Sequence, residues 1–418
     1  METYKLLITY ITLVIIAIII CEKYFANKRN IVIYTISDSV VNLSCGMLER
    51  LFDFFYAALF LQISTYLYNN VAPIQIPRNL YTISIALVLF DFTAYWFHRL
   101  SHKINFLWAS HIVHHQSEEL NLTTVFRVSF IAVIYRSLFF IWIPLVGFDA
   151  FTLLICGLSL GLFQLFTHSR IIGKLGFLEI FMTTPSHHRV HHGINKKYID
   201  HNYSHIFIFW DKLFGTFTPE TEEPNYGITS GFESTNPYTA QFSYWRNLFI
   251  RSKRTSHFSD KIKIFFKSPN WTPKDVAHLP IEYKTNKQGK RIHYKVTIAK
   301  ETGLYILTTT FFTFLTFAFL NISINPTEVN LMGRFTNPLV LTLAGIILFS
   351  IYAHGKMFEQ TTQSIRIEFI RLLMISFCAL YIQTQVLIET QITILFLILN
   401  IVFMTWLIKI KFINKKIE

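Results

Sequence analysis

The sequence predicts an all-α, multi-pass integral membrane protein with about nine membrane-spanning helices. Hydrophobic residues make up 52% of the 418 residues and charged residues 15%, a balance that is unusual for a soluble protein. The apolar residues gather in nine runs close to the length of about 20 residues that a bilayer-spanning helix needs. Basic residues lie between these runs and give a net charge of +13, which indicates cytoplasmic loops rather than a nucleic-acid-binding surface.

Five of the predicted spans come early in the chain, at residues 5–21, 52–68, 81–97, 130–147 and 150–167. No small-residue cleavage site follows the first run, and Lys23, Lys28 and Arg29 come next. We therefore expect a membrane helix whose C-terminal end faces the cytoplasm, not a removable signal peptide. The fourth and fifth spans are expected to form a hairpin in the bilayer.

A polar and basic region, residues 169–300, separates these spans from four later ones at 303–321, 338–353, 368–386 and 391–408. This order of spans places the N-terminus outside and residues 99–127 and 169–300 on the cytoplasmic side. The four cysteines form no motif, so neither a disulfide framework nor a zinc ribbon is expected.

The histidines are crowded into one part of the chain: twelve of the sixteen lie between His98 and His205. They form three motifs, HxxxH at 98–102, HxxHH at 111–115 and HxxHH at 188–192, with a lone histidine before the third motif. Residues three and four apart share one face of a helix, so each motif can point its rings at one centre. All three motifs are expected at the cytoplasmic membrane surface.

This pattern predicts a metal site, because imidazole is a good ligand for iron, copper, nickel and zinc. Nine imidazoles are more than one tetrahedral zinc uses, so two adjacent metal ions fit the number better. A structural zinc site without chemistry is the alternative. The predicted ligands are His98, His102, His111, His114, His115, His168, His188, His191 and His192.

Five further polar residues are candidates to orient the ligand rings by hydrogen bonds. A carboxylate near the end of a membrane span is costly to bury without a polar partner, and one predicted role for Asp91 is therefore to steady His98 or His102. The other candidates follow or flank the histidine motifs and are Glu118, Glu119, His187 and His201.

On these motifs the chain resembles the fatty acid hydroxylase/sterol desaturase superfamily, whose members are membrane oxygenases with a histidine-bound di-iron centre. The residues around the motifs, at 97–123, 184–203 and 210–217, are most similar to the branch that cleaves glyceryl ethers, the alkylglycerol monooxygenases. The resemblance covers about residues 80–230. It implies two iron ions and O2 as cofactors, a membrane lipid as substrate, and an electron donor.

One departure from that branch concerns the electron donor. The ether-cleaving enzymes use tetrahydrobiopterin and have an acidic residue directly after HxxxH, where this chain has Lys103. A cation at this place argues for a different donor, such as a small redox protein that binds the basic cytoplasmic face. Both the pterin and the redox protein stay open.

The resemblance and the hydropathy together predict four regions: N-terminal spans (1–80), a di-iron oxygenase domain (81–230), a cytoplasmic extension (231–300) and C-terminal spans (301–418). The predicted location is the inner membrane of a bacterium, or the endoplasmic reticulum of a eukaryote. Three functions remain. The first is an ether-lipid monooxygenase, the second a hydroxylase or desaturase of fatty acyl, sterol or carotenoid substrates, and the third a non-enzymatic, metal-stabilised lipid-binding protein.

Overall fold

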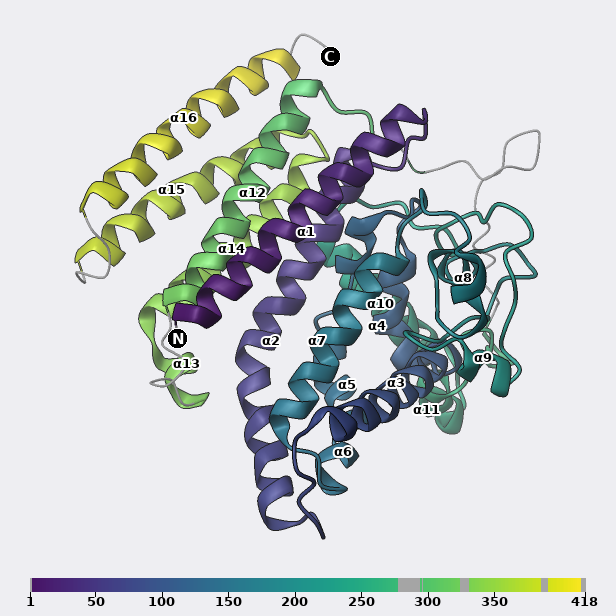
Figure 1. Ribbon diagram of the computed structural model, residues 1–418. Helices are drawn as coiled ribbons and strands as arrows, with labels where there is room; N and C mark the ends of the chain where they lie inside the picture. The colour runs from purple at the N-terminus through teal and green to yellow at the C-terminus, as the bar shows by residue number, and fades with distance from the viewer. Residues whose placement is uncertain (1, 277–293, 295, 324–330, 385–389, 415–418) are drawn as a thin grey trace. The chain divides into compact units, whose positions relative to one another are not determined.

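A computed structural model describes residues 2–276, 294, 296–323, 331–384 and 390–414. The regular secondary structure of these residues is helical, apart from a single isolated β-bridge between Met182 and Phe207, which confirms the all-α class (Figure 1). Within the predicted cytoplasmic extension, 231–300, residues 277–293 and 295 lie outside the described residues. The chain divides into two compact units, 1–35, 56–233 and 241–294 forming the first and 36–55, 234–240 and 295–418 the second.

The first unit contains the histidine motifs. Its helices are α1 (Glu2–Lys28), α3 (Leu80–Lys103), α4 (Asn105–His115), η1 (Leu122–Phe126), α5 (Ala132–Phe140), α6 (Trp142–Leu145), α7 (Ala150–Thr167), η2 (Gly176–Ile180), α8 (Pro185–His191), α9 (Phe209–Leu213) and α11 (Phe258–Phe266). Two helices have residues in both units, α2 (Ile36–Asn70) and α10 (Pro237–Arg254). The second unit adds α12 (Lys300–Ser323), α13 (Leu331–Thr336), α14 (Pro338–Met357), α15 (Thr362–Thr384) and α16 (Thr390–Asn414).

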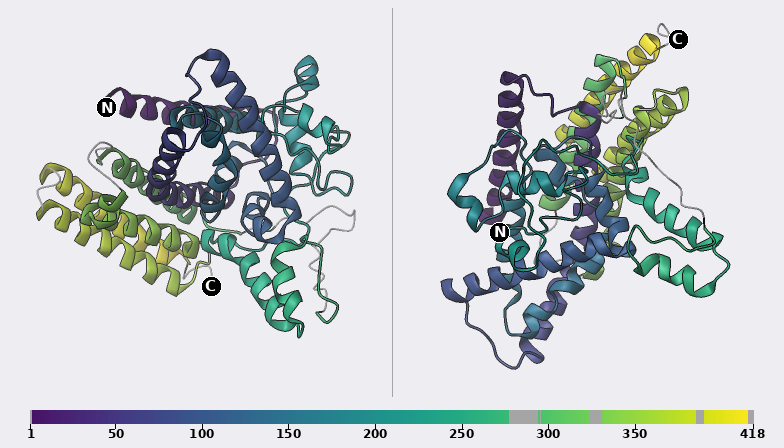
Figure 2. Two further views of the ribbon diagram at one scale, coloured as in Figure 1. Left: turned by 90° about the horizontal axis from the view of Figure 1, so that it is seen from below. Right: turned by 90° about the vertical axis from the view of Figure 1, so that its right-hand side faces the viewer.

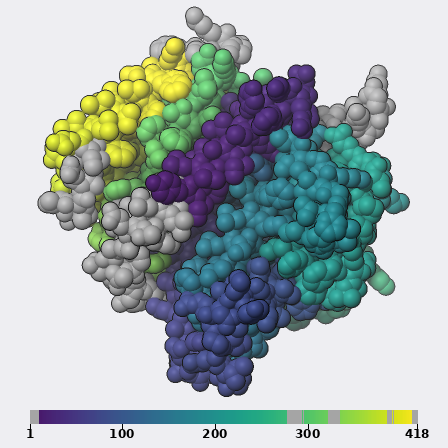
Figure 3. Space-filling model, in the orientation of Figure 1, coloured from purple at the N-terminus to yellow at the C-terminus, as the bar shows by residue number. Residues whose placement is uncertain are grey.

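Seven of the described helices are long and apolar enough to cross a membrane, so the count of nine is not confirmed. They are α1, α2, α3, α7, α12, α14 and α16. Their outward surface suits a bilayer: α1, drawn in purple in Figure 3, exposes Tyr10, Leu13 and Ile20.

The predicted span at 130–147 is broken into two short helices, α5 and α6, that meet at Ile141. The combined segment Ala132–Leu145 would extend about 20 Å at 1.5 Å per residue, which is less than the ~30 Å of a hydrocarbon core. Hydropathy alone did not reveal this break, because every residue of the run except Arg136 and Ser137 is apolar or aromatic.

Residues 368–384 of the predicted span at 368–386 lie in α15, and the last two lie outside the described residues. Helix α15 begins earlier and carries three charged residues near its start: Arg366, Glu368 and Arg371. Two of them form a buried ion pair, with Arg371 donating to both oxygens of Glu368 at 2.8 and 2.6 Å. The hydroxyl of Tyr305 also donates to Glu368, at 2.6 Å. These bonds compensate for burying charge in an otherwise apolar bundle.

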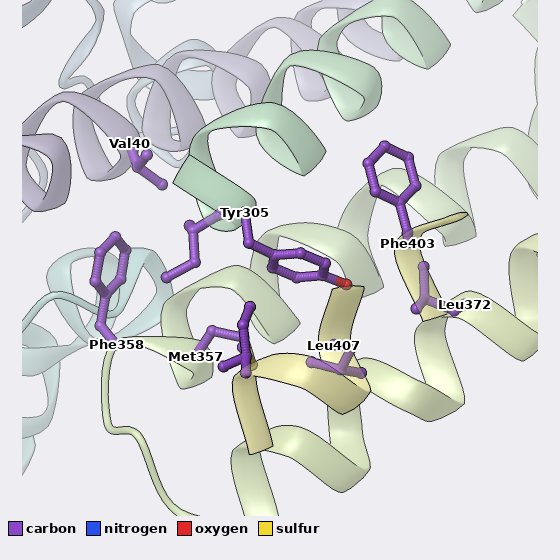
Figure 4. Packing of buried hydrophobic residues seen from close by; sticks show 9 residues of the cluster. Val40, Tyr305, Met357, Phe358, Leu372, Phe403 and Leu407 are labelled. Carbon is purple, nitrogen blue, oxygen red and sulfur yellow. The ribbon is translucent and has the colours of Figure 1, made fainter. Parts of the chain in front are cut away.

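The core of the second unit is made by α12, α14, α15 and α16, together with the start of α2. Figure 4 shows its central residues, with the ring of Tyr305 among side chains of the neighbouring helices. The buried members are Val40, Tyr305, Ile306, Met357, Phe358, Leu372, Phe403, Leu407 and Ile410.

In the first unit, the core that matters for the site joins α3 to α5, α6 and α7. Phe90 of α3 packs on Phe140 of α5 with ring centroids 4.2 Å apart. The same cluster includes Ala94 of α3 and Cys156 of α7. This packing holds α3 and α7 together, and the histidines follow at or just beyond the ends of these two helices.

Candidate metal centre

Helices α3 and α4 present the first two histidine motifs. Ile104 has an extended backbone, with φ −120° and ψ 120°, so it ends α3 directly before α4 begins at Asn105. The chain therefore turns after HxxxH and brings the face of α4 that carries HxxHH towards it. His98 and His102 come from α3, and His111 from α4 lies with its ring centroid 4.7 Å from that of His98.

Helices α7 and α8 supply the remaining histidines. His168 caps the C-terminal end of α7, where its Nδ1 lies 2.7 Å from the backbone oxygen of Gln164. Helix α8 starts with Pro185 in its first turn after the capping residue Thr184, a position at which proline costs no hydrogen bond. This short helix aims the rings of His188 and His191 inward.

The nine predicted histidines come together in two adjacent groups, in each of which the available ring nitrogens lie within 4.8 Å of one another. The rings of His115 and His192, one from each group, are stacked with centroids 4.5 Å apart. The first group is His98, His102, His111, His115 and His191, and the second is His114, His168, His188 and His192.

The spacing of the ring nitrogens matches a shared ion. Nε2 of His111 lies 3.0 Å from that of His98 and 3.2 Å from that of His115. In the second group, Nε2 of His188 lies 2.9 Å from that of His168 and 3.1 Å from that of His192. Two nitrogens bound at right angles to one ion, each at about 2.1 Å, would lie about 3.0 Å apart.

Hydrogen bonds to backbone carbonyls fix which nitrogen faces the centre. Nδ1 of His98 lies 2.7 Å from the oxygen of Tyr203, and Nδ1 of His114 lies 3.2 Å from the oxygen of Arg127. A carbonyl oxygen only accepts, so these Nδ1 atoms carry the proton and Nε2 keeps a bare lone pair in the neutral ring.

The pair His114 and His168 shows why a cation fits. Both rings donate from Nδ1 to a backbone carbonyl, yet their Nε2 atoms lie 3.1 Å apart. Two lone pairs at this distance repel each other unless a positive ion lies between them. Nε2 of His102 is also buried without a hydrogen-bond partner among the described residues. The donor set therefore fits metal ions.

Burial keeps these histidines neutral, the form that binds metal. Loss of solvent lowers the pKa of His168 to about 4. It also lowers, well below the ordinary value, the pKa of each of the other six grouped histidines that lie outside the membrane-length helices: His111, His114, His115, His188, His191 and His192.

The predicted role of Asp91 as a partner of His98 or His102 is not what the structure shows. Its fully buried carboxylate accepts hydrogen bonds from the backbone N–H groups of Ile206 and Phe207, at 2.9 and 3.1 Å, and from the indole of Trp210 at 3.0 Å. Asp91 thus ties α3 to the segment before α9. It can influence the histidines only by positioning the neighbouring backbone.

Of the other four candidates, three contact groups outside the two histidine groups, and the fourth, His201, contacts a grouped histidine. Glu119 pairs with Arg170 at 3.0 Å, and Glu118 accepts from the backbone N–H of Tyr294 at 2.5 Å. His187 belongs to neither group, and its ring packs against that of Phe217 with centroids 5.5 Å apart. His201 contributes its backbone oxygen, which lies 3.1 Å from Nδ1 of His191.

Sequence reasoning missed Asp200. One of its carboxylate oxygens lies 3.6 Å from Nδ1 of His102, and the other lies 2.6 Å from Nζ of Lys103. Asp200 has a left-handed backbone with φ +66°, which Asp tolerates better than most residues. The only available signal was its place in the stretch 198–203, which carried part of the resemblance.

The comparisons with known proteins agree with this geometry. Residues 83–216 match the fatty acid hydroxylase family. The matched segment is about a third of the chain. The resemblance that the motifs indicated is thereby confirmed, and eight of the nine grouped histidines fall in three motifs within the matched range. No solved structure matches this chain.

Three curated proteins illustrate the similarity. An alkylglycerol monooxygenase of Xenopus tropicalis is 38% identical over 240 residues, which is 57% of this chain and 53% of that protein. A human alkylglycerol monooxygenase is 37% identical, over 57% of this chain and 54% of that protein. An ornithine lipid hydroxylase of Rhizobium tropici is 30% identical over 36% of this chain and 46% of that protein. The chain spans about half the length of these relatives.

Proposed function

We propose that this chain is a di-iron, O2-dependent membrane monooxygenase that cleaves glyceryl ether lipids. The observation that carries this proposal is the pair of adjacent histidine groups, whose bare ring nitrogens lie about 3 Å apart. The similarity to alkylglycerol monooxygenases supports the choice of reaction. Imidazole suits iron, and nine rings provide five ligands for one ion and four for the other.

The proposed ligands of the first iron are His98, His102, His111, His115 and His191, and those of the second are His114, His168, His188 and His192. Bound iron would supply the activation of O2 and the insertion of one oxygen atom into a C–H bond. The other oxygen atom leaves as water, with two electrons from the donor and two protons. Hydroxylation of the carbon next to the ether oxygen gives a hemiacetal, which separates into an aldehyde and a glycerol.

The chain's own contribution is to hold and shield the site. Backbone carbonyls of Gln164, Arg127 and Tyr203 keep the rings of their histidines in one orientation. Burial of the imidazoles excludes water from the centre. Because α3 runs from a membrane-length segment directly into His98 and His102, a lipid with its tail among the spans can present a carbon near its headgroup.

We further propose the setting that this reaction requires. The oxygenase domain is residues 81–230, with spans on both sides and the extension 231–300 between it and the C-terminal spans. The site faces the cytoplasm, in a bacterial inner membrane or the endoplasmic reticulum. The electron donor is a pterin or a redox protein.

A second candidate function is the hydroxylation of a lipid to a stable alcohol. It is favoured by the similarity to an ornithine lipid hydroxylase, whose name describes the hydroxylation of a lipid. The same histidine groups would serve, and only the position of the carbon presented to them would differ.

The two functions are separated by the product. The purified chain in nanodiscs, loaded with iron, would be given O2 and either an alkylglycerol or the acyl ester of the same length. Tetrahydrobiopterin and a reduced ferredoxin would be supplied in separate reactions. We expect aldehyde from the alkylglycerol alone. A hydroxylated lipid without aldehyde would favour the second function, and no oxygen use with either donor would favour a non-enzymatic lipid-binding protein.

A further inference from the structure

A helical hairpin outside the histidine site exposes an unusual surface. Helices α10 and α11 lie side by side, visible as the teal-green pair in Figure 2, and Phe249 of α10 packs on Phe265 of α11 with centroids 5.4 Å apart. Along α10, Phe242, Arg246, Phe249 and Lys253 are all exposed. Their spacing of four, three and four residues places them on one face of the helix.

Helix α11 carries a second exposed stripe. Phe258, Ile262 and Phe266 are 76%, 49% and 65% exposed, and their spacing of four residues again defines one face. The opposite side of α11 is anchored, since Ile264 is fully buried with Leu248 of α10 and Ala109 of α4. The exposed residues are therefore held outward by a fixed core.

Aromatic rings join the two stripes. Phe106 of α4 packs edge-on to Trp245 of α10 at 5.1 Å and is stacked with Phe266 of α11 at 6.5 Å. Beside Trp245 an open groove of about 400 Å³ runs along α10, lined by Phe242, Trp245, Arg246, Phe249, Ile250 and Lys253. The apolar surface is thus continuous across the hairpin, with cations at its edge.

The hairpin is strongly basic. Residues 241–276 contain eight Lys or Arg and two Asp, which gives a net charge of +6. Both carboxylates are engaged: Asp260 pairs with Lys263 at 3.0 Å, and Asp275 accepts from Thr255 and Ser256. The surface as a whole is complementary to a negatively charged one.

Asn105 sets the position of this hairpin relative to a membrane helix. This residue follows Ile104, immediately after the membrane-length α3, and it is fully buried. Its side-chain amide donates to the backbone oxygen of Ile264 at 2.8 Å, and its oxygen accepts from the hydroxyl of Tyr244 at 2.6 Å. Both α10 and α11 are therefore fixed at the level where α3 leaves the apolar layer.

We propose that the α10–α11 hairpin docks on the surface of the phospholipid bilayer, with its phenylalanines among the acyl chains and its cations on anionic headgroups. Exposed Phe and Ile beside Lys and Arg are the composition of an interfacial helix, and cations near an anionic leaflet are attracted to it. If the hairpin faced water instead, the exposed apolar stripe would cost free energy and would favour aggregation. The tether at Asn105 holds the stripe where lipid is the neighbour.

The test is site-specific crosslinking in the full-length chain. The photoreactive analogue p-benzoylphenylalanine would replace Phe258 or Phe266 in separate variants, in nanodiscs of equal phosphatidylcholine and phosphatidylglycerol. The same analogue at Glu222, a half-exposed residue of the loop after α9, is the control. We expect phospholipid adducts in the mass spectrum of the two Phe variants and few at Glu222. Adducts to a second copy of the chain, or no lipid adduct above the control, would overturn the proposal.

A second measurement checks the role of charge. In the Phe258 variant, the adducts are expected to contain more phosphatidylglycerol than the equal mixture supplies. Adding Arg246→Gln and Lys253→Gln, which are solvent-exposed, should return the ratio towards one to one while adducts persist. An unchanged ratio in the charge variant would contradict recognition of anionic lipid. Neither readout requires an active or metal-loaded site, so failure here leaves the proposed oxygenase untouched.

Discussion

Lys103 Nζ lies 2.6 Å from Asp200 Oδ2, although 97 residues separate them in sequence. The other oxygen of Asp200 lies 3.6 Å from Nδ1 of His102. Lys103, the residue after HxxxH at which this chain departs from the ether-cleaving branch, therefore has a carboxylate partner within the domain. Lys103 holds a carboxylate beside a proposed ligand, and this role is compatible with either electron donor.

We predict that Lys103→Glu lowers activity rather than opening the site to pterin. Two carboxylates would then repel each other where an ion pair now lies, and Asp200 would move away from His102. Loss of a group that orients a metal-binding histidine typically costs about 10–100-fold in metal affinity or activity. Aldehyde release and iron content would be measured, with Lys103→Gln as the milder control. Higher pterin-dependent activity in Lys103→Glu would show that the residue selects the donor.

The two histidine groups predict a split in iron content. His188 is a proposed ligand, whereas its neighbour His187 lies outside both groups. We predict that His188→Ala retains about one iron per chain and His187→Ala about two, measured by elemental analysis of protein in nanodiscs. Equal iron content in the two variants would remove His188 from the metal site.

Activity should depend on both groups. We predict that His98→Ala, His114→Ala and His191→Ala each abolish aldehyde release while the chain still inserts in the membrane, because apolar helices insert without the metal. Membrane fractionation and the turnover assay would check this, with His187→Ala as the control. Substantial turnover by any of the three variants would exclude that residue as a ligand.

Asp91 should matter for stability more than for metal binding. Asp91→Ala would leave the buried N–H group of Ile206 and the partly buried one of Phe207 without their acceptor, at about 1–3 kcal/mol for a fully buried orphaned group. We predict a clear decrease in the thermal unfolding temperature, followed by tryptophan fluorescence. Asp91→Asn, which keeps one acceptor oxygen, should lose less. Wild-type stability of Asp91→Ala would refute this structural role.

The buried ion pair of the second unit gives a prediction with an internal control. Arg371→Leu would leave Glu368 buried without its cation, at a cost of about 3–5 kcal/mol. Replacing both residues by Leu removes the uncompensated charge as well, and should restore most of the stability. Thermal unfolding of the two variants decides this, since a double variant as unstable as Arg371→Leu would contradict the argument.

The helical class and the grouping of the histidines could be predicted from sequence because both depend on local spacing. On a helix, HxxxH and HxxHH place their histidines on one face, and the histidines of α3, α4 and α8 come together in the two groups. The hydrogen bonds that orient the rings could not be predicted. They come from backbone oxygens such as those of Tyr203 and Arg127, and only the folded chain brings these near the histidines.

Two of the nine predicted spans are not among the seven membrane-length helices of the described residues, and each has a physical reason. Hydropathy registers composition and does not detect that α5 and α6 are separate, short helices. The span placed at 368–386 begins on Glu368 and includes Arg371, two charged residues that pair with each other near the start of α15. The role of Asp91 was misassigned because its partners, 115 or more residues away, leave no local signal.

The origin of the product's oxygen atom tests the central claim most directly. The iron-loaded chain in nanodiscs would cleave an alkylglycerol under 18O2, and the aldehyde would be reduced at once to the alcohol to prevent exchange with water. We predict one 18O atom in the alcohol derived from the alkyl chain and none in the released glycerol, which keeps the ether oxygen. An unlabelled alcohol, or labelled lipid with its ether bond intact, would contradict oxygen insertion next to the ether as the reaction of this chain.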